Sequence, residues 1–146
     1  MKNKYDPLLL KNQLWFPTYA AANKIIRNYQ PLLKKLNLTY TQYVTMMVLW
    51  EKEEVNEKYL SETLYLQSNT LTPLLKKLKA KGYININKDK KDKRNILISL
   101  TKLGKELKDK ALEVPKALAE DSNLTLEEAI EYKRLLEKIL NGGNKK

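Results

Sequence analysis

Apolar residues recur at intervals of three and four along most of the chain and follow a period of two in only one region. Helical spacing covers residues 8–29, 44–52 and 126–140, which predicts amphipathic helices. Alternation replaces it over residues 84–86 and 96–100, where every second residue is Ile or Leu. Two alternating runs joined by a charged loop predict a β-hairpin with a long tip. The pattern therefore predicts a mainly α fold with a small β-hairpin.

Start and stop signals divide the helical regions further. Pro17 must lie where the first helix starts or kinks, because proline cannot donate a helical hydrogen bond. Pro31 predicts a boundary, followed by a short helix over residues 31–38. Thr39 or Thr41 can cap a helix that ends at about Lys52, and Asn56 can cap a short helix after it. Thr101 precedes a long helical region that Pro115 kinks or breaks. Thr125 with Glu128 forms a capping box for the last helix, which Gly142-Gly143 ends.

A short basic helix is predicted within residues 66–82, which read LQSNTLTPLLKKLKAKG. Thr72 followed by Pro73 is a start signal, and Gly82 is a stop signal. Four leucines at helical spacing share one face: Leu71, Leu74, Leu75 and Leu78. Four lysines occupy the other faces: Lys76, Lys77, Lys79 and Lys81. We expect a helix with one buried side and a strongly basic outer side.

Net charge is concentrated in the same part of the chain. The whole sequence carries a formal charge of +11. Residues 66–105 hold ten lysines and one arginine against two aspartates, a balance of +9 that leaves +2 for the other residues. Such a basic region is typical of a protein that binds a polyanion, most often nucleic acid. The alternative, a solvated surface in a lysine-rich chain, does not explain why the flanking regions are nearly neutral.

Two absent residue types narrow the range of functions. The chain contains no cysteine, which excludes disulfides, thiolate metal sites and thiol redox chemistry. It contains no histidine, the commonest general base and metal ligand. We therefore expect no enzymatic activity, catalytic residue, metal site or cofactor. The apolar runs at residues 8–10 and 43–50 are too short for a signal sequence or a membrane span, which predicts a cytoplasmic protein with no membrane partner.

The order of elements and the charge together predict a winged helix-turn-helix that binds double-stranded DNA. Two short helices in tandem, the second of them basic, are followed at once by the basic hairpin. In this motif the N-terminal residues of the second helix reach base edges in the major groove, whereas lysines one turn later contact phosphates. Candidate base-reading residues are Gln67, Ser68, Asn69, Thr70 and Thr72, with Lys76 and Lys77 as candidate phosphate contacts. Candidate wing residues are Lys88, Lys90, Lys91, Asp92, Lys93 and Arg94.

Two stretches of this region resemble the MarR family of transcription regulators: TLTPLLKKLKAKG and DKKDKRNILISLTKLG. In that family the wing has an Asp-x-Arg core, matched by Asp92 and Arg94, and the next strand ends in Leu-Thr-x-x-Gly, matched by residues 100–104. The stretch NQLWFPTYAAANKIIRNYQPLLKKLNLTYTQYVTMMVLWE is similar to the N-terminal half of the organic-hydroperoxide-sensing branch. The resemblance covers about residues 5–140 of the chain.

The resemblance implies a single domain over residues 1–146 that forms a homodimer. About residues 39–104 would form the winged-helix DNA-binding lobe, and about residues 5–37 and 105–141 would supply the dimerisation helices. It also implies that Asp92 and Arg94 pair to brace the wing while Arg94 enters the minor groove, where a narrow groove attracts arginine. The broad apolar faces of both terminal segments independently favour a partner chain.

The resemblance fails at one position. The branch carries its sensing cysteine where this chain has Trp15, and Tyr19, Tyr29 and Tyr40 match tyrosines that resemble the contacts around that thiol. Without cysteine the sulfenic-acid route is closed, so we expect a signal that is not thiol-based. Two interpretations stay open. These four aromatic residues pack in the core or dimer interface, or they belong to a sensor pocket that Trp15 fills or that binds a small apolar or phenolic ligand.

These observations predict a sequence-specific transcription regulator, acting as a repressor, that binds a pseudo-palindromic operator as a homodimer. The first alternative is a non-specific architectural DNA-binding protein, which would need no row of base-reading residues. The second alternative is a winged helix that serves protein interaction, in which substitution of Lys76 or Arg94 would leave the main activity intact.

Overall fold

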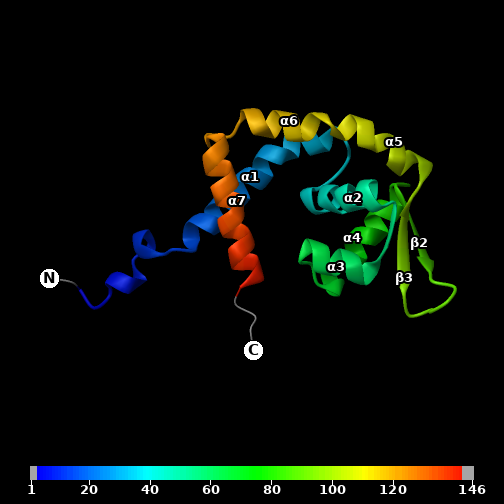
Figure 1. Ribbon diagram of the computed structural model, residues 1–146, viewed down its shortest axis with the longest axis horizontal. Helices are drawn as coiled ribbons and strands as arrows, with labels where there is room; N and C mark the ends of the chain where they lie inside the picture. The colour runs from blue at the N-terminus through cyan, green and yellow to red at the C-terminus, as the bar shows by residue number, and fades with distance from the viewer. Residues whose placement is uncertain (1–2, 143–146) are drawn as a thin grey trace. The chain divides into compact units, whose positions relative to one another are not determined.

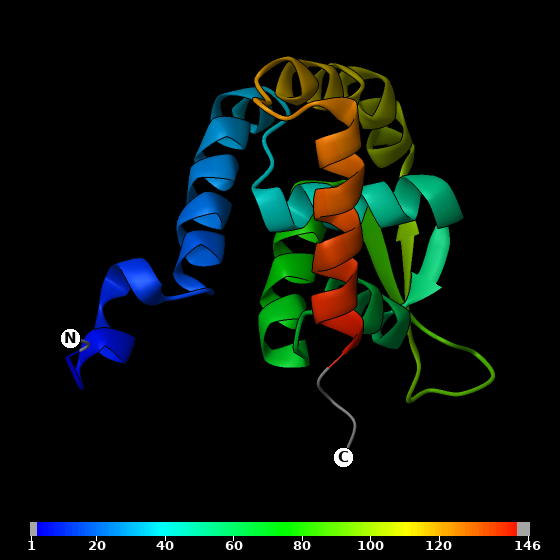
Figure 2. The same ribbon diagram turned by 60° about the vertical axis from the view of Figure 1, so that its left-hand side comes forward.

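The computed structural model describes residues 3–142 and separates the chain into two compact units, Met1–Pro115 and Lys116–Lys146. Figures 1 and 2 show that its elements are mostly helices, with one small sheet in the first unit. In chain order they are η1 (Asp6–Leu8), η2 (Leu10–Asn12), α1 (Phe16–Lys34), α2 (Tyr40–Lys52), β1 (Glu54–Asn56), α3 (Glu57–Leu64), α4 (Ser68–Ala80), β2 (Ile84–Lys88), β3 (Ile96–Leu100), α5 (Lys102–Ala111), α6 (Glu113–Glu120) and α7 (Leu126–Asn141). The predicted mainly α fold with a small β-hairpin is confirmed.

Helix α1 starts at Phe16, next to Pro17, which agrees with one of the two predicted outcomes, and it continues through Pro31. The predicted boundary at Pro31 is therefore wrong. Leu33, two residues further on, is only 1% exposed, so packing in the core keeps the last turn helical although proline removes a hydrogen bond. The chain turns instead at Asn37, which adopts a left-handed conformation with φ of 56°.

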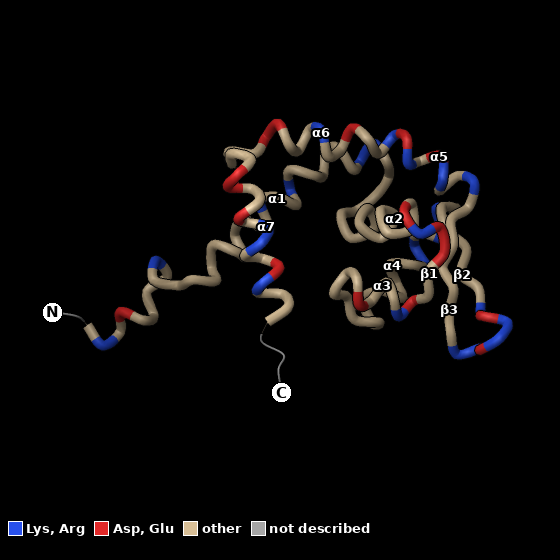
Figure 3. Tube along the Cα trace, viewed as in Figure 1, with Lys and Arg blue, Asp and Glu red and all other residues tan. Residues whose placement is uncertain are grey.

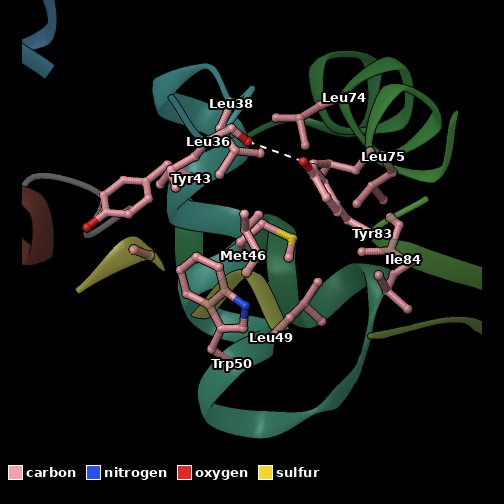
Figure 4. Packing of buried hydrophobic residues seen from close by; sticks show 14 of the residues in the cluster. Leu36, Leu38, Tyr43, Met46, Leu49, Trp50, Leu74, Leu75, Tyr83 and Ile84 are labelled. Carbon is pink, nitrogen blue, oxygen red and sulfur yellow. Dashed lines mark hydrogen bonds between the residues drawn. The ribbon is translucent and has the colours of Figure 1, made fainter. Parts of the chain in front are cut away.

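Helix α2 runs through the hydrophobic core of the first unit. Of the two predicted caps, Thr39 begins it: its hydroxyl accepts from the backbone N–H of Gln42, whose side chain accepts from the Thr39 N–H. Its core-facing residues are Tyr43, Met46, Leu49 and Trp50 (Figure 4). Figure 4 also shows the Tyr83 hydroxyl donating to the Leu36 carbonyl at 3.3 Å. This cluster joins the end of α1, α2, α4 and β2.

Helix α4 begins at Ser68 rather than at the predicted Thr72-Pro73 start. Pro73 lies inside the helix and removes the hydrogen bond that an N–H would make to the carbonyl four residues earlier. The predicted inward face is confirmed, because all four leucines are buried: Leu71, Leu74, Leu75 and Leu78. Burying each leucine contributes roughly 1.5–3 kcal/mol, which offsets the cost of an internal proline. The helix ends before Gly82, as predicted, where φ is +85°.

The predicted hairpin is present as β2 and β3, which pair antiparallel in the register Ile84 to Leu100 and Lys88 to Ile96. A third strand, β1, was not predicted. It is three residues long and pairs with β3 on the other side, with Val55 opposite Ile98, so the strand order is β1-β3-β2. The central strand β3 is thereby held at both edges, which fixes the base of the hairpin.

A junction of hydrogen bonds joins the hairpin to the start of α5. Thr101 caps α5 as predicted, accepting from the backbone N–H of Gly104 at 3.0 Å and donating to the carbonyl of Gly82 at 2.6 Å. The indole N–H of Trp50 donates to the carbonyl of Gly104 at 2.9 Å. A Cβ on Gly104 would lie 2.2 Å from the carbonyl oxygen of Tyr83, so only glycine allows this close approach.

The long helical region after Thr101 is broken, as expected near Pro115, into α5 and α6. Helix α5 ends at Ala111. That residue lies four positions before Pro115, and a proline ring clashes with the carbonyl at that spacing.

The second unit contains α7, which begins at the predicted capping box of Thr125 and Glu128. Gly142 is its C-cap, as predicted, whereas Gly143 lies outside the described residues. Several large apolar side chains of α7 are exposed: Leu126, Ile130, Leu135, Ile139 and Leu140. Within residues 3–142, no helix combines the length and apolarity needed to cross a lipid bilayer.

Candidate nucleic-acid interface

The start of α4 presents a row of exposed polar side chains. Gln67, Ser68, Asn69 and Thr70 are all exposed. Gln67 is the N-cap residue, yet its side chain makes no capping hydrogen bond. Because amide and hydroxyl groups can both donate and accept, this row can read the edges of bases in a major groove.

Thr72 differs from the other predicted base-reading residues. Its hydroxyl donates to the Oε1 atom of Glu57 at 3.0 Å, which links α4 to the first turn of α3. The hydroxyl is therefore engaged within the protein, and this contact helps to fix the angle between the two short helices.

Lysines continue the basic surface along α4. Lys76 and Lys77, the predicted phosphate contacts, are exposed. Among residues 3–142, no ion pair engages a lysine of α4. Their charges are thus available to an external anion, which suits contacts to phosphate.

The hairpin tip carries the second basic surface. Figure 3 shows blue basic segments along this tip, interrupted by red aspartates. We define residues 89–95 as the wing loop. All the predicted wing residues except Asp92 are basic, and these basic residues are exposed: Lys88, Lys90, Lys91, Lys93 and Arg94. Asp92 accepts from both the backbone N–H and the Nε of Arg94, at 3.0 and 3.2 Å, so the pair implied by the resemblance is present.

A second pair in the wing loop escaped the sequence analysis. Asp89 accepts from the backbone N–H of Lys91 at 2.9 Å and from the side-chain amide of Asn95 at 3.2 Å. These bonds, the Lys91 N–H first, hold the pKa of Asp89 below its ordinary value. Asp side chains often accept a hydrogen bond from the backbone N–H two residues on and so close a turn, and Asp89 at the start of the charged tip was the available clue.

Lys81, at the end of α4, was predicted only as one of several surface lysines. Its ammonium donates to the carbonyl of Asn37 at 2.6 Å and to the Oε1 atom of Gln42 at 2.8 Å. Burial, followed by the charge of Lys77, lowers the pKa of Lys81. This lysine therefore joins the recognition-type helix α4 to the corner between α1 and α2.

The residues predicted for a sensor pocket divide into two groups. Tyr29 and Tyr40 meet with ring centres 4.9 Å apart, and Tyr43 joins them at 6.0 and 6.4 Å. We call these three residues the tyrosine cluster. Burial is the main cause that raises the pKa of Tyr29 and of Tyr43. Trp15 and Tyr19 do not join the cluster within this chain, since they are 59% and 66% exposed.

A hollow of about 360 Å³ adjoins the tyrosine cluster. It lies between α2 and the α5–α6 region, and Tyr43, Met47, Trp50 and Lys108 contribute to its lining. Residues 3–142 contain no group of three or more acidic side chains placed to hold a metal ion.

Comparison with known proteins decides the family. A family model described as transcriptional regulator SarA/Rot matches residues 27–111, which is more than half of the chain. The chain belongs to the SarA/Rot family of transcriptional regulators. The chain is similar in fold to solved MarR-type regulators, including E. coli MarR with a TM-score of 0.81, so the predicted winged helix-turn-helix is confirmed.

Individual relatives of this SarA/Rot regulator agree with that assignment. The organic hydroperoxide resistance transcriptional regulator of Bacillus subtilis (strain 168) is 46% identical over 115 residues, which is 79% of this chain and 78% of the relative. SarZ of Staphylococcus aureus (strain USA300) is 41% identical over 120 residues, 82% of this chain and 81% of the relative. The solved structure of reduced AbfR bound to DNA matches with a TM-score of 0.77 and 31% identity, and covers 94% of both chains.

These relatives bear on two further predictions. The resemblance to MarR regulators and to their organic-hydroperoxide branch is confirmed by the Bacillus relative, although this chain has no cysteine. The relatives are transcriptional regulators rather than enzymes, which confirms that this SarA/Rot regulator is not an enzyme.

Proposed function

We propose that this SarA/Rot regulator is a cytoplasmic repressor that binds a pseudo-palindromic operator in double-stranded DNA as a homodimer. The observation that carries the proposal is the start of α4, where four exposed polar side chains precede exposed lysines. A purely electrostatic binder needs only the lysines, whereas base readout needs the polar row. The DNA bound in the solved AbfR structure supports the same partner for this chain.

The proposed binding mode uses two parts of the first unit. Gln67, Ser68, Asn69 and Thr70 read bases in the major groove, and Lys76 and Lys77 contact phosphates. Arg94 enters the minor groove from the wing loop, with the wing lysines on the flanking phosphates. In this proposal residues 39–104 are the DNA-binding lobe.

The homodimer is supported by apolar surface near both ends of the chain. In the first unit the exposed side chains include Leu8, Leu10, Leu14, Trp15 and Phe16. In the second unit α7 exposes a comparable set. Monomeric proteins rarely leave this many large apolar side chains near both ends open to water, so a second copy of the chain is the proposed cover. Residues 5–37 and 105–141 are then the dimerisation segments, and two α4 helices read two half-sites.

The proposed signal is not a thiol reaction, because the chain has no cysteine. The hollow beside the tyrosine cluster supports a small apolar or phenolic ligand, since its lining combines aromatic rings with the ammonium of Lys108. In a dimer, Trp15 of either chain would supply a further aromatic surface next to this cluster or fill its place.

Fluorescence anisotropy tests the proposed function. The titration uses duplexes taken from the DNA upstream of the gene and a scrambled duplex of equal length, each at two salt concentrations. A preference for the upstream duplex that persists at the higher salt supports a sequence-specific regulator. Equal binding of both duplexes that disappears with salt would replace the proposal with a non-specific architectural protein.

A further inference from the structure

Arg94 stands at the end of a loop whose shape must be fixed for the side chain to enter a groove. Its side chain is 92% exposed, and its side-chain contact is the one from Nε to Asp92 at 3.2 Å. Asp92 is only two residues away and belongs to the same loop. A contact within the loop cannot fix the direction of the loop relative to the strands that carry it.

Asp89 and Asn95 connect the two ends of the wing loop. Asp89 directly follows β2, and Asn95 directly precedes β3. The backbone N–H of Asp89 donates to the carbonyl of Asn95 at 2.8 Å, and the Asn95 side-chain amide donates to Oδ2 of Asp89 at 3.2 Å. Both residues are partly buried, whereas residues 90–94 between them are exposed.

The second carboxylate oxygen of Asp89 directs the chain out of the strand. Oδ1 accepts from the backbone N–H of Lys91 at 2.9 Å, which forms the turn into the exposed tip. Asn95 is further held by its backbone N–H, which donates to the carbonyl of Asp92 at 2.9 Å. One carboxylate therefore closes the base of the loop with one oxygen and starts its turn with the other.

We propose that Asp89 and Asn95 are positioning residues for DNA binding, which close the base of the wing loop and so fix the direction of Arg94. The inference rests on the proposed function, because it needs the wing to contact DNA. Neither residue has to touch the nucleic acid for this role.

Charge alone predicts the opposite role for Asp89. The wing approaches a polyanion, so a carboxylate there repels phosphates, and its removal should strengthen binding. If the carboxylate instead orders the loop, its removal weakens binding even though net charge becomes more favourable. The sign of the change in affinity therefore separates positioning from simple electrostatics.

The test compares Asp89→Asn, Asn95→Asp and the double exchange, using a duplex selected by the wild-type protein from a random pool. We expect Asp89→Asn to weaken binding about three- to tenfold, the scale of the net contribution of one ordinary hydrogen bond. Asn95→Asp places two carboxylates face to face and should weaken binding as well. The double exchange restores an amide–carboxylate pair at wild-type net charge, so it should recover most of the affinity.

Controls separate the role of this pair from folding and from net charge. All three variants should melt at the wild-type temperature, because the loop is outside the core. Asp109→Asn removes from α5 one exposed carboxylate, which makes no hydrogen bond or ion pair among residues 3–142, and should bind as well as wild type or slightly better. Asp89→Asn binding more tightly than wild type would overturn the inference, as would a double exchange no better than either single variant.

The proposed function can fail separately. If the wild-type protein enriches no duplex from the pool, sequence-specific binding itself is refuted. If Arg94→Ala weakens binding to the selected duplex while Asp89→Asn strengthens it, the wing contacts DNA and only the positioning role is refuted.

Discussion

Gly104 shows how one residue can be required by segments far away in the sequence. The resemblance to known regulators singled it out, but the sequence could not give the reason. Its carbonyl accepts from the indole of Trp50, 54 residues earlier, and its missing Cβ leaves room for the Tyr83 carbonyl. No local pattern joins these three residues. Residue types with a local role, such as the caps Thr39 and Thr101, were predictable because their partners lie three residues on.

Gly104→Ala should destabilise the protein. A Cβ would lie 2.2 Å from the Tyr83 oxygen, so the hairpin and α5 would have to separate. We expect a loss of about 1–3 kcal/mol in the free energy of unfolding, the usual cost of overpacking. Urea unfolding measures it. In an ordinary helix interior the same substitution would stabilise by about 1 kcal/mol, so a gain would contradict the close approach.

Asn69→Ala and Lys77→Ala should separate base readout from phosphate contact. Asn69→Ala should weaken binding to a specific duplex by about 1–3 kcal/mol and change binding to a scrambled duplex little. Lys77→Ala should weaken both duplexes alike and make the dependence of affinity on salt shallower. Anisotropy titrations at several salt concentrations measure both effects. Equal losses on both duplexes for Asn69→Ala would remove that residue from base readout.

At the scale of elements, the prolines and the shortest strand account for most of the errors. Pro31 and Pro73 were read as boundaries, yet both lie inside helices whose buried leucines sustain them. The helical spacing of the leucines was visible in the sequence. The sequence does not show how deeply they are buried, so it could not tell that their burial outweighs one lost hydrogen bond. Strand β1 was missed because three residues, Glu54–Asn56, are too few to show an alternation. The hairpin and the capping box of Thr125 and Glu128 were predicted, because the residues that form each of them lie close together in the sequence.

Lys81→Met should loosen the attachment of α4 to the corner between α1 and α2. Methionine keeps the unbranched stem but loses the hydrogen bonds to Asn37 and Gln42. We expect a loss of about 0.5–1.5 kcal/mol in the free energy of unfolding. Chemical denaturation measures it against Lys79→Met, which removes the same charge from an exposed position on the same helix. Equal stabilities of the two variants would show that the hydrogen bonds of the Lys81 ammonium do not contribute to the free energy of unfolding.

At the scale of the whole molecule, the sequence predicts a partner chain because both terminal segments carry broad apolar faces. A single chain of this size has too little other surface to cover them. The exposed leucines and isoleucines of α7 are consistent with that reasoning. The pattern of α7 predicts an apolar stripe, but the same stripe would pack equally well inside a larger monomer. Its exposed state could be learned only from the folded unit. The concentration of positive charge in residues 66–105, by contrast, could be counted directly from the sequence.

Ile139→Asp should dissociate the proposed homodimer. Ile139 is 48% exposed in the single chain, so its substitution should leave the fold of one chain intact. A carboxylate buried at an interface without a partner costs several kcal/mol, which favours the monomer. Sedimentation velocity should show half the mass, with weaker operator binding. Lys138→Asp, at the exposed neighbouring position, is the matched control and should stay dimeric. A monomeric wild-type protein would refute the homodimer.

The concentration of basic residues on α4 and the wing has a consequence inside a cell. Genomic DNA offers a very large number of non-specific sites, and a protein with this charge spends most of its time on them. Occupancy of the proposed operator then depends on competition between that one site and all the others rather than on a single dissociation constant. A lysine substitution weakens both sides of that competition, so its severe effect in a test tube should shrink in vivo. A substitution in the polar row weakens specific binding alone, so the proposed repression should be lost in vivo as fully as the binding is lost in the test tube.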